Sequence, residues 1–230
     1  MTDPSDPPPL DYPPPPWRAR GELWMSAFRT REALQLPADL TPLGSRHTLI
    51  AVLVRYTEGT LRYDEFAVGS MARRGRHMGM LCHRIWVDSA SSLHGGRQLW
   101  GIQKELANFS WSEGSVRIGD TTGPIATLRV GSHSRRRIPI SRVPSVGFGR
   151  IDSERTLLTG RIAGRLGTSR ISPREWDARL PGLASPEPRY TLSVSRARFV
   201  FPEGTLLGRV DAYATEQSHP VGGSGYSPNW

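Results

Sequence analysis

The sequence predicts a mainly β protein, a β-rich α+β chain whose strands form a closed or partly closed antiparallel barrel with a few short helices. Two observations carry this prediction. Apolar residues recur with a period of two or in short runs bounded by turn residues, and both patterns are typical of strands. The 230 residues include 20 prolines and 24 glycines, which favour turns and short strands over long helices. Many strands at hairpin spacing favour a barrel or a sandwich.

The expected strands follow one another along most of the chain. Residues 21–28 form the first strand, and residues 49–56, rich in Val and Ile, suit a strand buried on both faces. The turn Glu58-Gly59-Thr60 then leads into a hairpin partner at 61–68. The remaining strands are expected at 78–87, 125–130, 156–166, 190–201 and 206–213.

Few segments favour a helix, and the two ends differ from the middle. We expect short helices at 30–36 and within 96–109, and one helical turn after Pro173. Residues 1–16 contain eight prolines, which predict an extended arm. Residues 218–230 are rich in Gly, Ser and Pro and predict a flexible tail. The chain thus divides into a Pro-rich arm (1–16), one barrel domain (17–217) and a C-terminal tail (218–230).

The charge of the chain invites anionic partners, because the net charge is +9 and the calculated pI is near 10.7. Apart from Arg135-Arg136-Arg137, most arginines are scattered singly. This pattern favours a solvated surface, so we expect no nucleic-acid partner. No run approaches the roughly 20 apolar residues that span a bilayer, so we expect no membrane partner. No secretory signal is evident either, and we expect a cytoplasmic protein.

Cysteine and histidine usage adds little chemistry. The single cysteine, Cys82, excludes a disulfide framework within the chain. His77, His83 and His94 match no standard metal-ligand spacing, so we expect no metal site.

Lysine usage is the most informative count. The chain holds 29 arginines and one lysine, Lys104. Arginine replaces lysine in surface roles, but it does not lose its proton at neutral pH and attack a carbonyl. A sequence that keeps one amine indicates a place where an amine is required. The alternative is a stray surface lysine.

A second candidate lies on the expected strand 61–68. Leu61, Tyr63, Glu65 and Ala67 share one face of that strand, which is apolar except for the acid. Burying an acid is costly unless it is paired or protonated. Glu65 therefore belongs either to an acid–base site or to a structural pair with an arginine.

The segment 93–109 is unusual because it holds three glycines, Gly95, Gly96 and Gly101, within seven residues. They indicate close backbone approach or an abrupt turn, since each glycine costs a helix interior about 1 kcal/mol. A regular helix here would place Lys104 opposite the apolar stripe. A helix that breaks at Gly101 would free Lys104 from that arrangement.

The segment 96–106, GRQLWGIQKEL, resembles the signature of the acetoacetate decarboxylase family. The lysine of that signature is the Schiff-base residue of the family, and it matches Lys104. Tyr63-Asp64-Glu65 is similar to a tyrosine-x-glutamate segment whose acid lines the family's active site, and the acid matches Glu65. The opening residues 15–21, PPWRARG, also resemble the family, whose active-site arginine falls near Arg20.

The resemblance implies a barrel of the acetoacetate decarboxylase-like type, a homo-oligomer and no cofactor. It implies a Schiff-base-forming lyase of the decarboxylase, aldolase or dehydratase type. Lys104 would attack a small keto acid or related carbonyl compound, and Glu65 would move protons. Arg20 and Arg97 would hold a substrate carboxylate. Trp100 and Tyr63 would line the substrate site.

Three positions depart from the family pattern. A second lysine after the nucleophile is Glu105 here, and the proline before it is Gln103. A second active-site acid falls at Ile50. These departures leave a second hypothesis open, a non-catalytic member of the same fold that binds a small ligand, with Lys104 solvated and protonated. A titration of Lys104 would separate the two, since a lowered pKa supports the enzyme.

Overall fold

The computed structural model describes residues 12–210. Most of the predicted Pro-rich arm and all of the predicted tail at 218–230 lie outside these residues. The described part holds one helix, α1 (Ala90–Trp100), among fourteen strands. The strands are β1 (Trp17–Arg29), β2 (Thr41–Pro42), β3 (Thr48–Gly59), β4 (Tyr63–Arg74), β5 (His77–Val87), β6 (Glu105–Leu106), β7 (Asn108–Ser112), β8 (Ser115–Asp120), β9 (Gly123–Val130), β10 (Ile138–Ile151), β11 (Glu154–Gly167), β12 (Ile171–Trp176), β13 (Tyr190–Phe201) and β14 (Thr205–Arg209).

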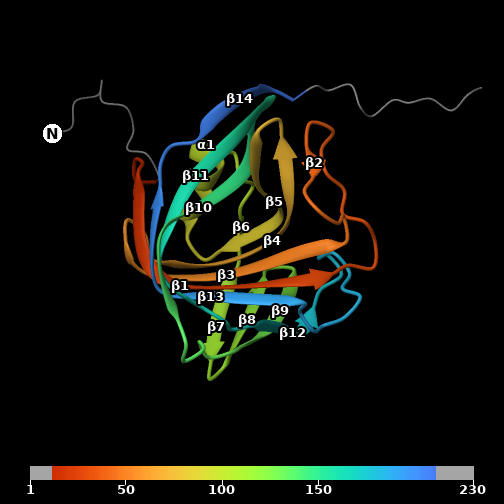
Figure 1. Ribbon diagram of the computed structural model, residues 1–230, viewed down its shortest axis with the longest axis vertical. Helices are drawn as coiled ribbons and strands as arrows, with labels where there is room; N and C mark the ends of the chain where they lie inside the picture. The colour runs from red at the N-terminus through yellow and green to blue at the C-terminus, as the bar shows by residue number, and fades with distance from the viewer. Residues whose placement is uncertain (1–11, 211–230) are drawn as a thin grey trace, which may run out of the picture.

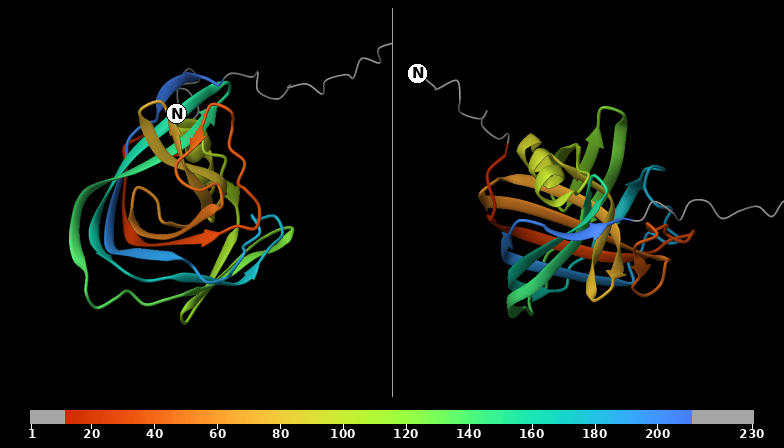
Figure 2. Two further views of the ribbon diagram at one scale, coloured as in Figure 1. Left: turned by 45° about the vertical axis from the view of Figure 1, so that its right-hand side comes forward. Right: turned by 90° about the horizontal axis from the view of Figure 1, so that it is seen from above.

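Seven of these strands close into a barrel, in the order β4-β3-β1-β13-β11-β10-β5, with β5 pairing back onto β4 (Figures 1 and 2). Neighbours are antiparallel except at β10 and β5, which run parallel over Gly147–Phe148 and Met80–Leu81. The predicted closed, mainly antiparallel barrel is therefore confirmed, with one parallel contact that the sequence did not indicate.

A second sheet of four strands, in the order β12-β9-β8-β7, covers one outer face of the barrel (Figure 1). Trp24, Leu53 and Phe66 point outward from β1, β3 and β4 and pack against Val116 and Ile125 of this sheet. Because these strands are covered on both faces, β3 can carry a nearly continuous apolar run. This explains the run at 49–56 that predicted a strand buried on both faces.

The alternate residues of the same strands face the barrel interior. Leu23, Val54, Tyr63 and Phe199, from four different strands, meet there in one buried cluster. Leu93 joins them from helix α1. The interior is therefore a packed core, and any polar side chain on these faces is removed from water.

Two of the predicted helices are wrong. Residues 30–36 have no helical structure, because their backbone N–H groups bond to distant loops: Arg31 to the carbonyl of Gly182 and Leu34 to that of Arg46. Pro173 lies in strand β12 at the edge of the second sheet, next to a register shift, and an edge with a bulge is where a strand accepts proline.

The last predicted strand is shorter than expected. It corresponds to β14, which pairs with β11, while part of the predicted range 206–213 lies outside the described residues. No helix within residues 12–210 is long and apolar enough to cross a membrane. Residues 12–210 also hold no group of three His, Cys, Asp or Glu side chains placed to hold a metal ion.

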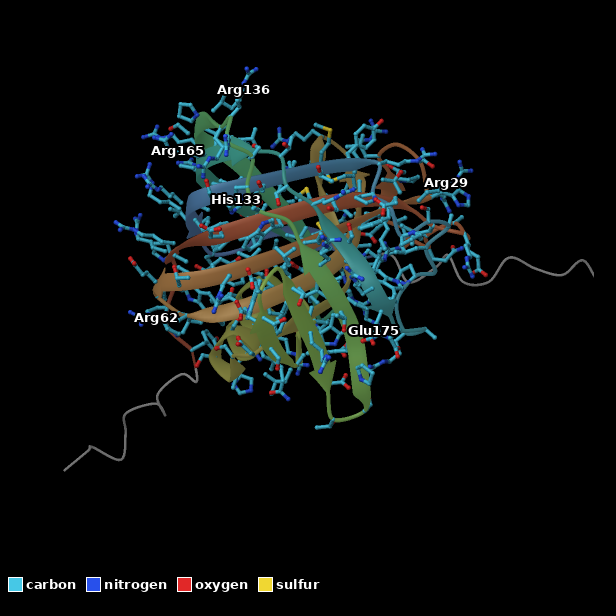
Figure 3. All side chains as sticks on the ribbon, turned by 90° about the horizontal axis from the view of Figure 1, so that it is seen from below. Arg29, Arg62, His133, Arg136, Arg165 and Glu175 are labelled. Atoms are coloured by element: carbon cyan, nitrogen blue, oxygen red, sulfur yellow. The ribbon has the colours of Figure 1, made fainter. Side chains whose placement is uncertain are left out.

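The arginines are spread over several edges of the molecule, as Arg29, Arg62 and Arg136 show in Figure 3. Two of the arginines, Arg155 and Arg74, contact the same acid, Asp39. Arg155 is buried and donates to both carboxylate oxygens of Asp39, at 2.9 and 2.8 Å. Arg74 approaches the same carboxylate at 3.6 Å.

Candidate active site

Helix α1 begins and ends where local chemistry requires it. Ser89 is the N-cap, and its side chain accepts a hydrogen bond from the backbone N–H of Ser92. Gly101 is the C-cap in the left-handed region (φ 65°), and its N–H bonds to the carbonyl of Arg97. The predicted helix within 96–109 is thus wrong in its bounds, because the helix stops before Lys104. The arrangement that would have exposed Lys104 does not apply.

The three glycines of this segment each allow a close approach. A Cβ on Gly95 would lie 2.4 Å from the Trp17 ring, and one on Gly96 would lie 2.7 Å from the Lys104 side chain. A Cβ on Gly101 would lie 2.4 Å from the backbone of Arg150. Contacts below 3.0 Å are not tolerated, so the glycines let a tryptophan, the lysine and a strand press against α1.

Lys104 lies in the short connection between α1 and β6, with its main chain held from the helix. The guanidinium of Arg97 donates two hydrogen bonds to the Lys104 carbonyl, at 3.1 and 2.7 Å. The Lys104 N–H donates to the carbonyl of Ile102 at 2.9 Å. This frame directs the lysine side chain back across Gly96 into the protein, where it is only 4% exposed.

The amine of Lys104 ends beside two acceptors. Nζ donates to Oε2 of Glu65 at 2.7 Å and to Oγ of Ser92 at 3.0 Å. It also lies 5.3 Å from the centre of the Tyr63 ring. A buried cation is stable only when it is paired and hydrogen-bonded, and these groups meet that condition.

Glu65 lies on the inward face of β4, in line with Tyr63 and Ala67, as the alternation predicted. Its carboxylate pairs with the lysine and not with an arginine. The Tyr63 hydroxyl lies 3.5 Å from Oε2 of Glu65, and the Tyr63 ring packs on Tyr56 with centroids 4.5 Å apart. The acid is 14% exposed, more than the amine.

The charges in this cluster act strongly on one another. Burial lowers the pKa of Lys104, but the charge of Glu65, with Tyr63 and Cys82, raises it more, so the pKa lies above its ordinary value. Burial raises the pKa of Tyr63 to about 12, against the opposing effect of the amine. Burial and the charge of Glu65 raise the pKa of the Cys82 thiol to about 12. At neutral pH the Lys104 amine is therefore an ammonium, and the Tyr63 phenol and the Cys82 thiol are neutral.

Three other predicted site residues do not contact the amine. Arg97 holds the main chain of Lys104. Trp100 is buried, donates its indole N–H to the carbonyl of Pro202 and packs edge-on against Trp17 at 4.7 Å. Arg20 points outward from β1, is 69% exposed and pairs with Glu58. The structure brings Lys104, Glu65 and Tyr63 together and leaves these three outside that contact.

The structure also shows where the three residues that depart from the family pattern lie. The Glu105 side chain pairs with Arg84 at 2.9 Å, and it is not among the groups that shift the pKa of Lys104. Gln103 is exposed, and Ile50 is half-buried on β3. The acid that follows the lysine in sequence therefore does not set the charge of the amine.

Two polar members of the cluster were not predicted from the sequence. Ser92 is fully buried on α1 and accepts from the lysine, while Cys82 comes from β5. Ser92 lies twelve residues before Lys104, on helix α1, and Cys82 lies on a different element of the barrel. Only the packing of α1 and β5 around β4 reveals them.

The fold and the cluster define the class of this protein, a β-barrel protein with a buried amine–carboxylate pair in its interior. A family model described as acetoacetate decarboxylase matches residues 2–138, more than half of the chain. The chain belongs to the acetoacetate decarboxylase family. No protein among the curated sequences matches it.

Solved structures show the same fold. The crystal structure of acetoacetate decarboxylase from Legionella pneumophila is similar with a TM-score of 0.70 and 17% identity, covering 91% of this chain and 94% of that one. The enduracididine biosynthesis enzyme MppR, complexed with pyruvate, has a TM-score of 0.57 and 15% identity, covering 86% and 93%. An acetoacetate decarboxylase-like enzyme from Sphingomonas wittichii has a TM-score of 0.57 and 15% identity, covering 84% and 93%.

Proposed function

We propose that this protein is a Schiff-base-forming lyase that acts on a small keto acid or a related carbonyl compound through Lys104. The single observation that carries the proposal is the placement of the only lysine. Its amine lies inside the barrel, 2.7 Å from a carboxylate that is also inside. A surface lysine kept by chance would have no such partner.

The first step requires a neutral amine, and the pair supplies the means. Before the substrate enters, the raised pKa of Lys104 keeps its amine as an ammonium. Transfer of one proton from Nζ to Oε2 of Glu65 leaves a neutral amine and a neutral carboxylic acid. The proton stays within the pair, and after the transfer neither group of the buried pair is charged. Entry of an uncharged carbonyl group beside the amine favours this form, because it removes water from the ions.

The next steps need these two groups and one proton from solvent. The amine attacks the carbonyl carbon, the oxygen takes up one proton from the nitrogen and one from the Glu65 carboxylic acid, and loss of water gives an iminium cation beside the Glu65 carboxylate. With a β-keto acid, the bond to the carboxylate carbon then breaks, and its electron pair forms an enamine as carbon dioxide leaves. The Glu65 carboxylate takes up a proton from solvent and passes it to the enamine carbon. Hydrolysis of the iminium returns the ketone product and the amine.

Aldol or dehydration chemistry would use the same iminium. There the carboxylate of Glu65 removes a proton from the carbon next to the iminium, and the enamine then expels a hydroxyl group or attacks a second carbonyl. The proposal therefore names the nucleophile and the proton carrier, and it covers these reactions as one class.

The ion pair itself favours a second candidate function. An ammonium held by Glu65 and Ser92 is a poor nucleophile, and it suits a protein that binds a small ligand without reacting. That candidate was predicted with a solvated lysine, whereas Lys104 is buried. In this form the ammonium would donate a hydrogen bond to the carbonyl oxygen of the ligand.

Reductive trapping separates the two functions. The protein is incubated with acetoacetate or pyruvate, borohydride is added, and the intact mass is measured. The chain offers only two amines, Lys104 and its N-terminus, so peptide mapping assigns any adduct. An adduct at Lys104 that is absent from Lys104→Arg supports the lyase.

Ligand binding is measured in parallel by calorimetry on the same protein. Saturable binding with no adduct across a panel of keto acids and aldehydes would instead support the non-catalytic binder. Homo-oligomeric assembly and a cytoplasmic location stay predictions, and light scattering checks the first.

A further inference from the structure

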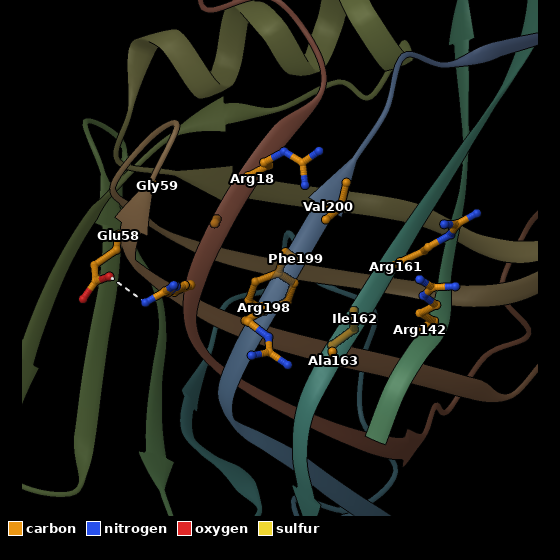
Figure 4. A pocket seen from close by; sticks show the side chains of 12 residues that line it. Arg18, Glu58, Gly59, Arg142, Arg161, Ile162, Ala163, Arg198, Phe199 and Val200 are labelled. Carbon is orange, nitrogen blue, oxygen red and sulfur yellow. Dashed lines mark ion pairs between the residues drawn. The ribbon is translucent and has the colours of Figure 1, made fainter. Parts of the chain in front are cut away.

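A groove of about 590 Å³ lies on the outer wall of the barrel, away from the lysine cluster (Figure 4). Strands β1, β10, β11 and β13 form its walls, and the end of β3 closes one side. Its volume is within the range of sites that hold small molecules, about 300–1,000 Å³. The groove is not part of the chemistry proposed for Lys104.

Strand alternation places arginines in this groove. Ala19, Ile162 and Phe199 belong to the interior cluster, so their neighbours along each strand point outward. These neighbours include Arg18, Arg20, Arg161 and Arg198, and Arg142 joins them from β10. Figure 4 shows the labelled guanidinium groups around a floor of Ala163 and Val200.

The strand register sets the arginines in two rows. Arg20 is directly opposite Arg198, and Arg198 is opposite Ala163. In the second row Arg18 and Arg161 flank Val200. Strands lie about 4.8 Å apart and alternate residues about 7 Å apart along a strand. The guanidinium groups therefore arise from an area of about 10 Å by about 7 Å.

Backbone strain contributes to the same arrangement. Arg142 adopts a positive φ of 55°, which is uncommon for a residue with a side chain. It lies where the pairing of β10 with β11 shifts register, between Ile140 and Val143. A bulge of this kind re-aims a side chain, and here it turns a fifth arginine to the groove.

Negative charge does not balance these groups. Glu58 is the one acid among the lining residues, and it lies 3.7 Å from Arg20, with both side chains more than half exposed. Like charges that face each other across an antiparallel pair are destabilising. Glu58 offsets the charge of Arg20 only, so no acid among the lining residues is left for Arg198, and a bound anion would supply its counter-charge.

We propose that this groove binds an anion that carries two or more linked phosphate groups, such as a short polyphosphate or a nucleoside triphosphate. The planar guanidinium forms two parallel hydrogen bonds to phosphate oxygens. A chain of phosphates contacts several guanidinium groups of both rows together, whereas a single carboxylate contacts one or two. A second copy of this face is a poor occupant, because five arginines would meet five.

The test is calorimetric titration of the full chain with inorganic tripolyphosphate, and with ATP as a second arm. Tripolyphosphate is expected to bind with 1:1 stoichiometry and to weaken as salt rises. Arg198→Ala and Arg161→Ala each lower the affinity about 10-fold or more, the effect of losing one charged hydrogen bond. Arg62→Ala, an exposed arginine on the β3–β4 side of the barrel, leaves the affinity unchanged.

Two further arms sharpen the result. Arg198→Lys keeps the positive charge but removes the planar guanidinium that forms two parallel hydrogen bonds. This variant is therefore expected to bind tripolyphosphate more weakly than the parent chain does. Tighter binding of ATP than of tripolyphosphate would assign the ligand as a nucleotide, and equal binding would assign it as a polyphosphate. Both outcomes support the site.

Three outcomes would overturn the proposal. The first is no saturable binding of either probe, and the second is equal loss of affinity in Arg198→Ala, Arg161→Ala and Arg62→Ala. The third is binding of duplex DNA more tightly than of both probes, with the same dependence on Arg198. Trapping at Lys104 does not enter any of these readouts, so the test stands apart from the lyase proposal.

Discussion

The side chain of Lys104 crosses helix α1 directly over Gly96, where a Cβ would lie 2.7 Å from both Cδ and Cε of the lysine. The missing side chain at this position thus determines where the amine can lie. Gly95, one residue earlier, allows the same close contact for the Trp17 ring. The helix therefore offers two neighbouring glycines, one that serves the lysine and one that serves the core.

Gly96→Ala is expected to displace the Lys104 amine while the fold persists, because the far end of a lysine moves more easily than backbone. Displacing a reactive group by about 1 Å costs up to about 100-fold in rate, so adduct formation in reductive trapping should fall about 10- to 100-fold. Gly95→Ala is the matched control, since its Cβ meets Trp17. It should lower the thermal midpoint and leave trapping per folded molecule unchanged. Equal trapping by both variants would contradict the role of Gly96.

Glu65→Gln is expected to make the Lys104 amine more reactive in reductive methylation and to lower the rate of product formation. The variant removes the charge that raises the pKa of the amine and leaves burial, which lowers it. Each unit by which the pKa falls gives 10-fold more neutral amine. Reductive methylation of Lys104 at pH 7, measured against the N-terminal amine, should therefore rise at least about 10-fold. Product formation should fall about 10²- to 10⁴-fold, because the proton carrier is lost.

The control for this experiment is Glu105→Gln. Glu105 follows the lysine in sequence but pairs with Arg84, so the variant should leave methylation of Lys104 unchanged. If Glu105→Gln and Glu65→Gln behave alike, the amine does not depend on the 2.7 Å contact with Glu65.

The ion pair also predicts how stability depends on pH. The pKa of Lys104 is higher in the folded protein than its ordinary value, which is about 10.4 in an unfolded chain. The folded state therefore binds this proton more tightly, and the stabilisation is complete below about pH 10.4 and lost as the pH rises further. The free energy of unfolding of the parent chain, minus that of the double variant Lys104→Met/Glu65→Gln, should be constant from pH 6 to 9, because the double variant leaves no unpaired acid to titrate. A difference that already declines within that range would mean a lowered pKa.

Alternation and composition were enough to predict the barrel and the direction of Glu65. Period-two apolar patterns placed β1, β3, β4, β5, β11 and β13, because these strands are covered on one or both faces. Strand β10 was missed, since Pro139 and Pro144 interrupt its pattern. Its first half pairs only with β11, and an unpaired edge tolerates proline.

The partners of the lysine were harder to predict, because they depend on distances between elements. Ser92 is twelve residues from Lys104 along the chain, on a helix whose start depends on the cap at Ser89. The outward direction of Arg20 follows from alternation along β1. The register of β1 against β3 shifts directly after Arg20, and the amino-acid composition does not predict this shift. The direction of a side chain was therefore predictable where it depends on alternation along one strand. The partners of a side chain were not predictable where they depend on contact between two elements.

His133 lies between a serine and a carboxylate, as in a hydrolase triad, and yet the geometry predicts a structural role. Its ring bonds through Nδ1 to Oγ of Ser193 at 2.8 Å and through Nε2 to Glu22, and it stacks on Trp24 at 5.2 Å. Ser193 is fully buried behind the ring, so no substrate reaches the hydroxyl. The triad instead fastens residues 131–137 to β1 and β13. Figure 3 shows His133 beside these strands.

His133→Ala should therefore leave Ser193 unbonded inside the protein, which costs about 1–3 kcal/mol. We expect faster hydrogen exchange confined to residues 131–137 and the strands beside them, and a lower midpoint in urea. His77→Ala, at the start of β5 and away from this contact, serves as the control. A fluorophosphonate probe, which labels reactive serines, should leave Ser193 unmodified in both the parent chain and the control. Labelling of Ser193 in the parent chain would show that the serine is accessible, and a hydrolytic role would then replace the structural one.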